Sequence, residues 1–255
     1  MSSSLINCLP MLWRIPLQMV VVPVSTLVLG LTMILLCPLD PTRRLFHHLS
    51  RLWSGIFCGS MGVHVQVEGK ENVDPQQAAI FVANHQSLLD PPVLFFAIPA
   101  NLRVIAKRSL LLVPIFGQAL WAAGIIFINR RDRKNSIASM NRAAARIHGG
   151  MSVLIFAEGT RSRDGRLLPM KKGAFVLAIK AGVPVQPVVV TGTRNLLPPG
   201  SFFPRPGTVH VTFLPAIATR GLTYDDRHQL LEKTVQAMQD QLEVKEADAM
   251  EQVAS

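Results

Sequence analysis

The segment AIFVANHQSLLDPP, residues 79–92, passes from an apolar run through a polar corner to a pair of prolines. The apolar run at residues 79–83 is short and bounded by polar residues, which is typical of a buried strand. Asp90 followed by Pro91 is typical of a helix start, because proline fits the first helical turn. A strand that leads through a loop into a helix is the building unit of α/β folds. This segment therefore indicates the fold class.

The same alternation continues on both sides of this segment. Apolar runs that predict strands cover Val63–Val67, Ala79–Ala83, Leu102–Ala106, Ile125–Ile128, Val153–Phe156, Val183–Val190 and Val209–Leu214. Helical patterns between them cover Pro91–Ala97, Pro114–Ala123, Ser136–His148 and Lys172–Ala181. The alternation predicts one α/β domain over residues 61–220, with a mostly parallel central sheet flanked by helices. Ligands of such sheets bind at the carboxyl ends of the strands.

The first sixty residues differ from this domain. Ile15 to Leu39 is a run of 25 uncharged residues, and a membrane-spanning helix needs about 20. The run is too long for the apolar core of a signal peptide. Arg14 precedes it, whereas Arg43, Arg44 and Arg51 follow it. The positive-inside rule then favours a cytoplasmic location for the rest of the chain. A buried core helix is the alternative.

A second helix is predicted over residues 43–60. Leu45, Leu49, Leu52 and Ile56 recur at helical spacing, as in an amphipathic helix that lies in the membrane interface. Residues 1–60 are therefore predicted to be an N-terminal membrane anchor, with the hydrophobic helix 15–39 and the amphipathic helix together able to form a hairpin. Both a true crossing and a hairpin within one leaflet remain open.

The composition indicates an anionic partner. Charged residues make up 16% of the chain, below the roughly 25% of average soluble domains, and the formal net charge is +10. The range Arg103–Lys180 holds most of this excess, which suits nucleic acid, an acidic lipid surface or a phosphorylated substrate. Residues 221–255 are acidic and predict a separate solvated helix from about Tyr224 to Glu246. The apolar content excludes disorder, and the 3 cysteines exclude a disulfide framework.

The polar corner after residue 83 holds a candidate base. His85 lies just beyond the predicted strand and Asp90 begins the next helix, so the intervening turn can bring their side chains together. Asp90 would accept a hydrogen bond from Nδ1 of His85, which leaves Nε2 free to take a proton. The alternative is that Asp90 only caps the helix and His85 is a loop histidine.

Three further strand ends carry polar side chains. In FAEGTRSR, residues 156–163, Arg161 and Arg163 suit bidentate phosphate binding, with the Thr160 hydroxyl assisting. Glu158 is suited to hold the arginines or to accept a substrate hydroxyl. The alternative is an arginine-rich surface loop. Arg130 ends the run GIIFINR, residues 124–130. An arginine at the end of an apolar strand is well placed to point into a site, so Arg130 is a candidate site residue. The basic cluster that follows it is expected to face solvent or lipid: Arg131, Arg133 and Lys134.

Lys107 has the same placement after residues 102–106, with Arg108 as its rival. The run VPVQPV, residues 183–188, contains two prolines, which indicate an edge strand or a bend. No ligand cluster with metal spacing occurs, so no metal is expected.

The order of these motifs resembles a known family. His-x4-Asp, then Gly-x-x-Phe-Ile-x-Arg, Phe-x-Glu-Gly-Thr-Arg-Ser and Val-Pro-Val-x-Pro-Val is similar to the glycerolipid acyltransferases, and most to their bacterial 1-acyl-sn-glycerol-3-phosphate acyltransferase branch. The resemblance covers about residues 60–215. One departure is Arg108-Ser109-Leu110, where the branch often has an acidic residue before the leucine. This departure bears on how the acceptor head group is held.

The resemblance implies an enzyme that needs no cofactor and moves a fatty acyl group from acyl-CoA or acyl-carrier protein to the sn-2 hydroxyl of lysophosphatidic acid, giving phosphatidic acid. It implies that His85 is the base and Asp90 its orienter. The glycerol-phosphate site would comprise Glu158, Gly159, Thr160 and Arg161, with Lys107 and Arg130 as further phosphate contacts. The partners would be the lysolipid, the acyl thioester and a phospholipid membrane, with residues 61–220 on the cytoplasmic face of a bacterial inner membrane.

Other functions remain open at this point. The acceptor alternatives are glycerol 3-phosphate and lyso-ornithine lipid. A different class is a non-catalytic basic protein that binds lipid or nucleic acid, including a pseudo-enzyme. Nucleic acid is not expected as a partner, because 6% aromatic residues with a single tyrosine give little for base stacking.

Overall fold

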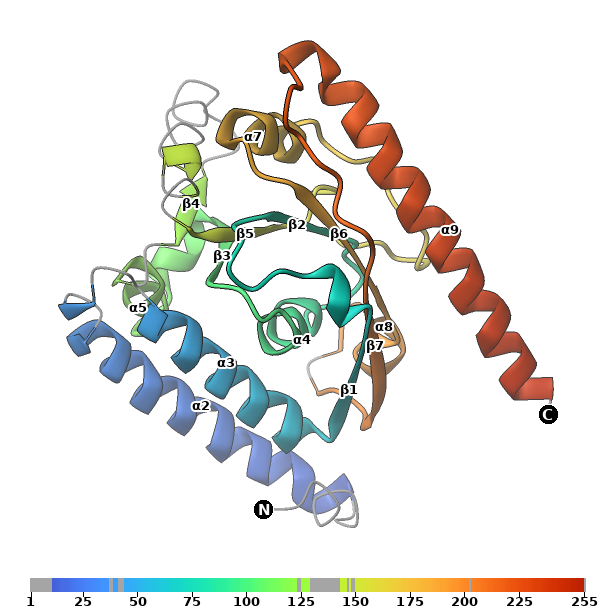
Figure 1. Cartoon of the computed structure of the whole chain (residues 1–255). Helices are drawn as coiled ribbons and strands as arrows, with labels where there is room; N and C mark the ends of the chain where they lie inside the picture. Colours follow the sequence, from blue (N-terminus) through green and yellow to red (C-terminus); the bar gives the residue numbers. More distant parts are fainter. Residues whose placement is uncertain are drawn as a thin grey trace.

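A computed structural model describes residues 11–36, 39–40, 44–122, 125–128, 143–145, 147, 150–201 and 203–254. The chain begins with two helices, α2 (Met11–Leu36) and α3 (Arg44–Met61). They lie side by side along one flank of the molecule (Figure 1). Trp53 on α3 donates a hydrogen bond from Nε1 to Oγ1 of Thr26 on α2, 2.9 Å away. The two predicted N-terminal helices therefore pack as a pair against the rest of the protein.

A seven-stranded sheet follows, in the order β1-β7-β6-β2-β5-β3-β4. Its strands are β1 (Val63–Glu68), β2 (Ile80–Ala83), β3 (Leu102–Lys107), β4 (Ile126–Ile128), β5 (Ser152–Ile155), β6 (Val185–Thr191) and β7 (Gly207–Phe213). Every neighbouring pair is parallel except β6 with β7, which is antiparallel. The predicted mostly parallel sheet flanked by helices is confirmed.

The other elements surround this sheet. They are η2 (Lys70–Asn72), α4 (Asp90–Ala97), η3 (Arg108–Leu112), α5 (Phe116–Ala122), α7 (Gly173–Ala181), α8 (Thr193–Leu196), η4 (Tyr224–Asp226) and α9 (Arg227–Ala254). The predicted helix over Ser136–His148 falls mostly outside the described residues. The division of the chain at residues 60 and 220 stays a prediction.

Alternate residues of the central strands face two hydrophobic cores. Phe81 and Ala83 of β2 belong to the core beneath α3 and α4, whereas Ile80 and Val82 belong to the core beneath α7 and α9. Figure 1 shows these helices on opposite sides of the sheet. Because side chains alternate along a strand, a residue that follows Ala83 by two, His85, is directed to the α3–α4 side.

The C-terminal helix is not separate from the domain. Leu230, Thr234 and Met238 recur every four residues on α9 and are buried, and Leu230 and Met238 join the core beneath α7. Farther along, Nζ of Lys245 lies 2.8 Å from Oε2 of Glu68 on β1. The prediction of a separate solvated helix is therefore wrong, because one apolar stripe covers the sheet while the other faces carry the acidic residues.

A proline lies inside the central strand β6. The predicted edge strand or bend is wrong for Pro187, because β6 lies between β7 and β2. The carbonyl of Pro187 accepts a hydrogen bond from the Leu214 N–H at 3.1 Å. The nitrogen and carbonyl of a strand residue point to the same side, so the missing N–H also faces β7. An N–H at this position would reach the Leu214 carbonyl, which instead accepts a hydrogen bond from Nε2 of Gln186. A side-chain donor therefore replaces the ladder bond that the proline cannot make.

Candidate active site

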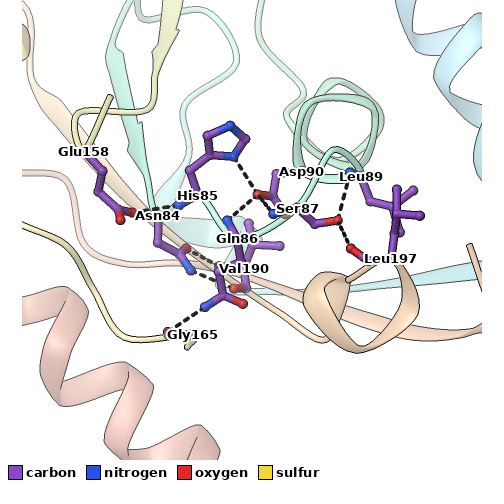
Figure 2. Close-up of polar contacts among 10 residues, drawn as sticks. All are labelled: Asn84, His85, Gln86, Ser87, Leu89, Asp90, Glu158, Gly165, Val190 and Leu197. Carbon is purple, nitrogen blue, oxygen red and sulfur yellow. Dashed lines mark hydrogen bonds and ion pairs between the residues drawn. The ribbon is translucent and has the colours of Figure 1, made fainter. Parts of the chain in front are cut away.

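The candidate site lies where β2, β5 and β6 end. These strands are parallel neighbours, so their carboxyl ends meet at one edge of the sheet. Just beyond β2, Nδ2 of Asn84 donates to the Val190 carbonyl at 2.9 Å, and the Val190 N–H donates to Oδ1 of Asn84 at 2.8 Å (Figure 2). The Asn84 carboxamide thus takes the place of a backbone pair and fixes the chain where the polar corner begins.

His85 and Asp90 form the predicted pair. Nδ1 of His85 lies 2.7 Å from Oδ2 of Asp90, whose side chain is fully buried at the start of α4. The same oxygen accepts the backbone N–H groups of Gln86 and Ser87, at 2.7 and 2.8 Å. The carboxylate therefore shapes the turn and orients the ring (Figure 2). A carboxylate partner assigns the ring proton to Nδ1 and leaves Nε2 as the proton acceptor.

Two side chains tie this corner to neighbouring loops. Oγ of Ser87 donates to the Leu197 carbonyl at 2.8 Å and accepts the Leu89 N–H at 3.2 Å. Nε2 of Gln86 donates to the Gly165 carbonyl at 2.9 Å. These bonds fix the loop between His85 and Asp90 through two adjacent residues, so His85 lies on a well-held turn.

Glu158 braces the corner from the β5 side. Its Oε1 accepts the His85 N–H at 2.7 Å (Figure 2). Its Oε2 accepts the Leu168 N–H at 3.1 Å. Only 4% of the residue is exposed. Burial raises the pKa of this carboxyl, and the two backbone donors act in the opposite direction. The structure thus brings Glu158 to the histidine through the backbone rather than to the cavity described next.

A cavity of about 830 Å³ opens beside the ring of His85. Gly159, Thr160 and Arg161 also line it. They lie near His85, because the next residue, Ser162, donates its backbone N–H to the His85 carbonyl at 2.7 Å. Its remaining walls are mostly apolar and come from α2, α3, α4, β3 and α5, including Gly30, Met33, Phe46, Trp53, Phe95 and Leu120. The cavity therefore combines an imidazole and a guanidinium with a mostly apolar wall. That combination suits a fatty chain with a reactive or charged head.

Gly159 holds its loop in a conformation that favours glycine. Its φ is +77°, and a Cβ built on it would lie 2.8 Å from Nζ of Lys171. This backbone conformation sets the position of the next two residues, Thr160 and Arg161.

The structure places the remaining predicted residues less fully. Lys107 is the last residue of β3, at the same edge of the sheet, but its side chain lies outside the described part of the structure. Arg130 and the cluster after it lie outside the described residues altogether. Within the described ranges, no group of three or more His, Cys, Asp or Glu side chains is placed to hold a metal ion.

Sequence reasoning missed two contributions to the site. Phe156 stacks on the His85 ring with centroids 4.1 Å apart and planes inclined at 24°. The second contribution is the cavity wall from α2 and α3, which the sequence assigned to the membrane alone. The sequence offered only part of a signal for Phe156. It ends the predicted strand Val153–Phe156, but the position of that strand beside the strand that leads to His85 comes from the structure.

Comparisons with known proteins indicate the family of this chain. A family model described as Acyltransferase matches residues 64–191. Mouse 1-acyl-sn-glycerol-3-phosphate acyltransferase alpha is 39% identical over 167 residues, 65% of this chain and 59% of the mouse protein. The Limnanthes douglasii 1-acyl-sn-glycerol-3-phosphate acyltransferase is 34% identical over 207 residues, 80% of this chain and 73% of that protein.

A solved structure also resembles the chain over most of its length. The crystal structure of the 1-acyl-sn-glycerophosphate (LPA) acyltransferase PlsC from Thermotoga maritima has a TM-score of 0.75 and 26% identity, and the match covers 90% of this chain and 95% of that one. Against some curated relatives the span is shorter, as with the chloroplastic LPAT1 of Arabidopsis thaliana, where it is 46% of the relative's length. With a matching family model that covers half of its residues, the chain belongs to the acyltransferase family.

Proposed function

We propose that this protein transfers a fatty acyl group from an acyl thioester to the sn-2 hydroxyl of 1-acyl-sn-glycerol 3-phosphate, giving phosphatidic acid. The observation that carries the proposal is the His85–Asp90 pair beside a mostly apolar cavity. The names of the similar proteins support the choice of acceptor.

The proposed step is a direct transfer. Nε2 of His85 takes the hydroxyl proton as the acceptor oxygen attacks the thioester carbonyl, and the ester bond forms. The carbon–sulfur bond then breaks, and the thiolate leaves with the proton from the imidazolium. Asp90 stabilises the imidazolium that forms between these events. The acceptor hydroxyl is itself the nucleophile, so the step uses only these side chains and the two substrates.

Positioning supplies the other part of the rate enhancement. Arg161 and Thr160 line the cavity with His85, where a guanidinium suits a phosphate. Lys107 and Arg130 are proposed as further phosphate contacts on the basis of the resemblance. A phosphate held there would fix the sn-2 hydroxyl beside the base. The apolar interior would hold a fatty chain.

Membrane association is part of the proposal. Ile15–Leu36 is long and apolar enough to cross a membrane. One side of α2 packs against the protein along its length through Val22, Gly30 and Met33. The other side exposes large apolar residues: Met19, Val20, Val24, Leu27, Val28, Leu31 and Leu35. A helix with one side on the protein and an exposed apolar side favours a hairpin within one leaflet. The arginines after residue 40 favour the cytoplasmic face of a bacterial inner membrane.

The test is an assay of thiol release by the purified full chain in mixed micelles. Release should require added lysophosphatidic acid, and His85→Ala should reduce it by about 10²–10⁴-fold, the usual contribution of a general base. Glycerol 3-phosphate and lyso-ornithine lipid serve as competing acceptors, and acyl-CoA and acyl-carrier protein as competing donors. Release that ignores the acceptor, or a folded His85→Ala protein with near-wild-type turnover, would reject the proposal.

A further inference from the structure

The face of the catalytic imidazole is covered by an aromatic ring. Phe156 directly follows β5, the neighbour of the strand that leads to His85. Its ring lies 4.1 Å from the imidazole centroid at an angle of 24°, so the two rings are stacked. Both residues line the cavity. The contact therefore belongs to the reacting end of the site rather than to the core behind it.

We propose that Phe156 is a positioning residue for His85, which fixes the plane of the imidazole and stabilises the imidazolium that forms during acyl transfer. This inference rests on the proposed function. The π face of an aromatic ring carries partial negative charge, and it attracts a cation within about 6 Å. The attraction is absent while the imidazole is neutral and appears when the proton arrives. It therefore acts on the transition state more than on the resting site.

The stack complements the Asp90 contact. Asp90 holds the ring through Nδ1, in the plane of the imidazole, whereas Phe156 contacts one face. Other charged groups near the ring are the buried Glu158, which accepts the His85 backbone N–H, and Arg161, which lines the same cavity. A guanidinium opposes imidazolium formation, so a group that favours the cation without adding charge is useful here. An aromatic face does this and leaves Arg161 free for an anion.

The primary variant is Phe156→Leu, which keeps an apolar side chain but removes the π face. The plateau of kcat should fall by about tenfold, as expected from the loss of a desolvated cation–π contact. The acidic limb of the kcat/KM profile should move to lower pH by about half a unit or more, because the imidazolium is less stable and the free base persists in more acid solution. A purely structural role of Phe156 would lower the plateau of kcat and leave the acidic limb of the kcat/KM profile at the same pH.

Three further variants complete the experiment. Phe156→Tyr retains the face and should keep both the plateau and the limb close to wild type. Phe156→Met is a second non-aromatic variant in case the leucine protein does not fold. Phe95→Leu is the matched control, because it removes a phenylalanine from the same cavity without touching the imidazole; whatever it does to turnover, it should not move the limb. A limb that is unmoved in both non-aromatic variants, or that moves equally in Phe95→Leu, would overturn the proposal.

A spectroscopic readout separates this inference from the proposed function. The titration midpoint of the His85 ring can be followed by NMR in ¹⁵N-histidine-labelled protein, with the signal assigned by its loss in His85→Ala. It should fall in Phe156→Leu and not in Phe95→Leu, whatever the acceptor proves to be. Wild-type protein without lysophosphatidate acylation would reject the proposed function, while an unchanged midpoint would reject the role of Phe156.

Discussion

His85 is held by groups that lie far from it in the sequence. Asp90 is five residues away, but Glu158 contacts the His85 backbone across a separation of 73 residues. Both carboxylates accept backbone N–H groups as well as serving the histidine. Each carboxylate therefore both fixes the backbone and holds the histidine. Substitutions at either one should change stability and activity together.

For Glu158 the two tasks can be separated by pH. Burial raises the pKa of its carboxyl above the ordinary value of 4.5. An acid with a raised pKa in the folded state stabilises the protein when it is protonated, and this stability is lost as the pH rises through the folded value. Glutamine does not titrate. The unfolding free energy of wild type minus that of Glu158→Gln should therefore decrease from about pH 4 to pH 7.

Urea denaturation in a fixed detergent, repeated across this pH range, measures that difference. A difference that is constant or increases with pH would contradict the assignment. Activity provides a second reading, because the glutamine can accept only one of the two backbone N–H groups. We expect a reduced kcat with His85 and Asp90 still present.

Gly159→Ala should be harmful because of the backbone rather than because of crowding. The Cβ would approach only the end of the flexible Lys171 side chain, which can move. The φ of +77° remains, and it costs a non-glycine residue about 1–2 kcal/mol. We expect either that loss in unfolding free energy or a relaxed loop that misplaces Thr160 and Arg161. Thermal unfolding and the KM for lysolipid distinguish these results, and an unchanged protein in both assays would refute the argument.

Local patterns revealed the residues that lie close together in the sequence. His85 and Asp90 stand between an apolar run and a proline pair, so a turn between them was a local inference, and the 2.7 Å contact agrees with it. The bonds of Glu158 depend on the order of the strands, which no local pattern states. The stacking of Phe156 depends on the same order. The sequence therefore predicted the contact between His85 and Asp90 but not the groups that support it.

At the scale of elements, α2 and α3 each have one side that packs against the protein and one side that is exposed. On α3 the buried positions include Ser50, Ser54 and Cys58, whereas Leu52 is 53% exposed. Small side chains let α3 approach its neighbours closely, and the leucine stripe that the sequence marked is partly left on the outside. Helical spacing predicted both helices well. It did not predict which side of α3 would face the protein, because that depends on what packs against it.

The outer side of α2 provides a matched test of membrane binding. Val28 on α2 is 54% exposed and Val244 on α9 is 53% exposed. A charged side chain in the hydrocarbon region costs about 2.5–3.5 kcal/mol. Val28→Glu should therefore weaken binding to phospholipid vesicles by at least about tenfold, whereas Val244→Glu should leave it unchanged. Vesicle flotation measures both. Equal binding by the two variants would remove α2 from the membrane contact.

For the whole molecule, the formal net charge of +10 predicts a salt-dependent attraction to anionic lipid. Screening shortens the range of this attraction from about 10 Å at ~0.1 M salt to about 3 Å at ~1 M. Binding to vesicles that contain anionic lipid should weaken at least tenfold over this range. Binding to zwitterionic vesicles should change little, because insertion of apolar side chains carries no such dependence. Similar salt profiles on both vesicle types would contradict this prediction.

The cavity wall formed by α2 and α3 has a consequence for the fate of the donor. A histidine that activates a lipid alcohol can equally activate water, and a thioester is open to either nucleophile. With the two helices in place, the acyl chain and its carbonyl are shielded on that flank. A protein whose helices are pulled away should therefore release free fatty acid at the expense of ester. Under the proposed function, the segment that we place in the lipid would then also set the balance between ester synthesis and hydrolysis.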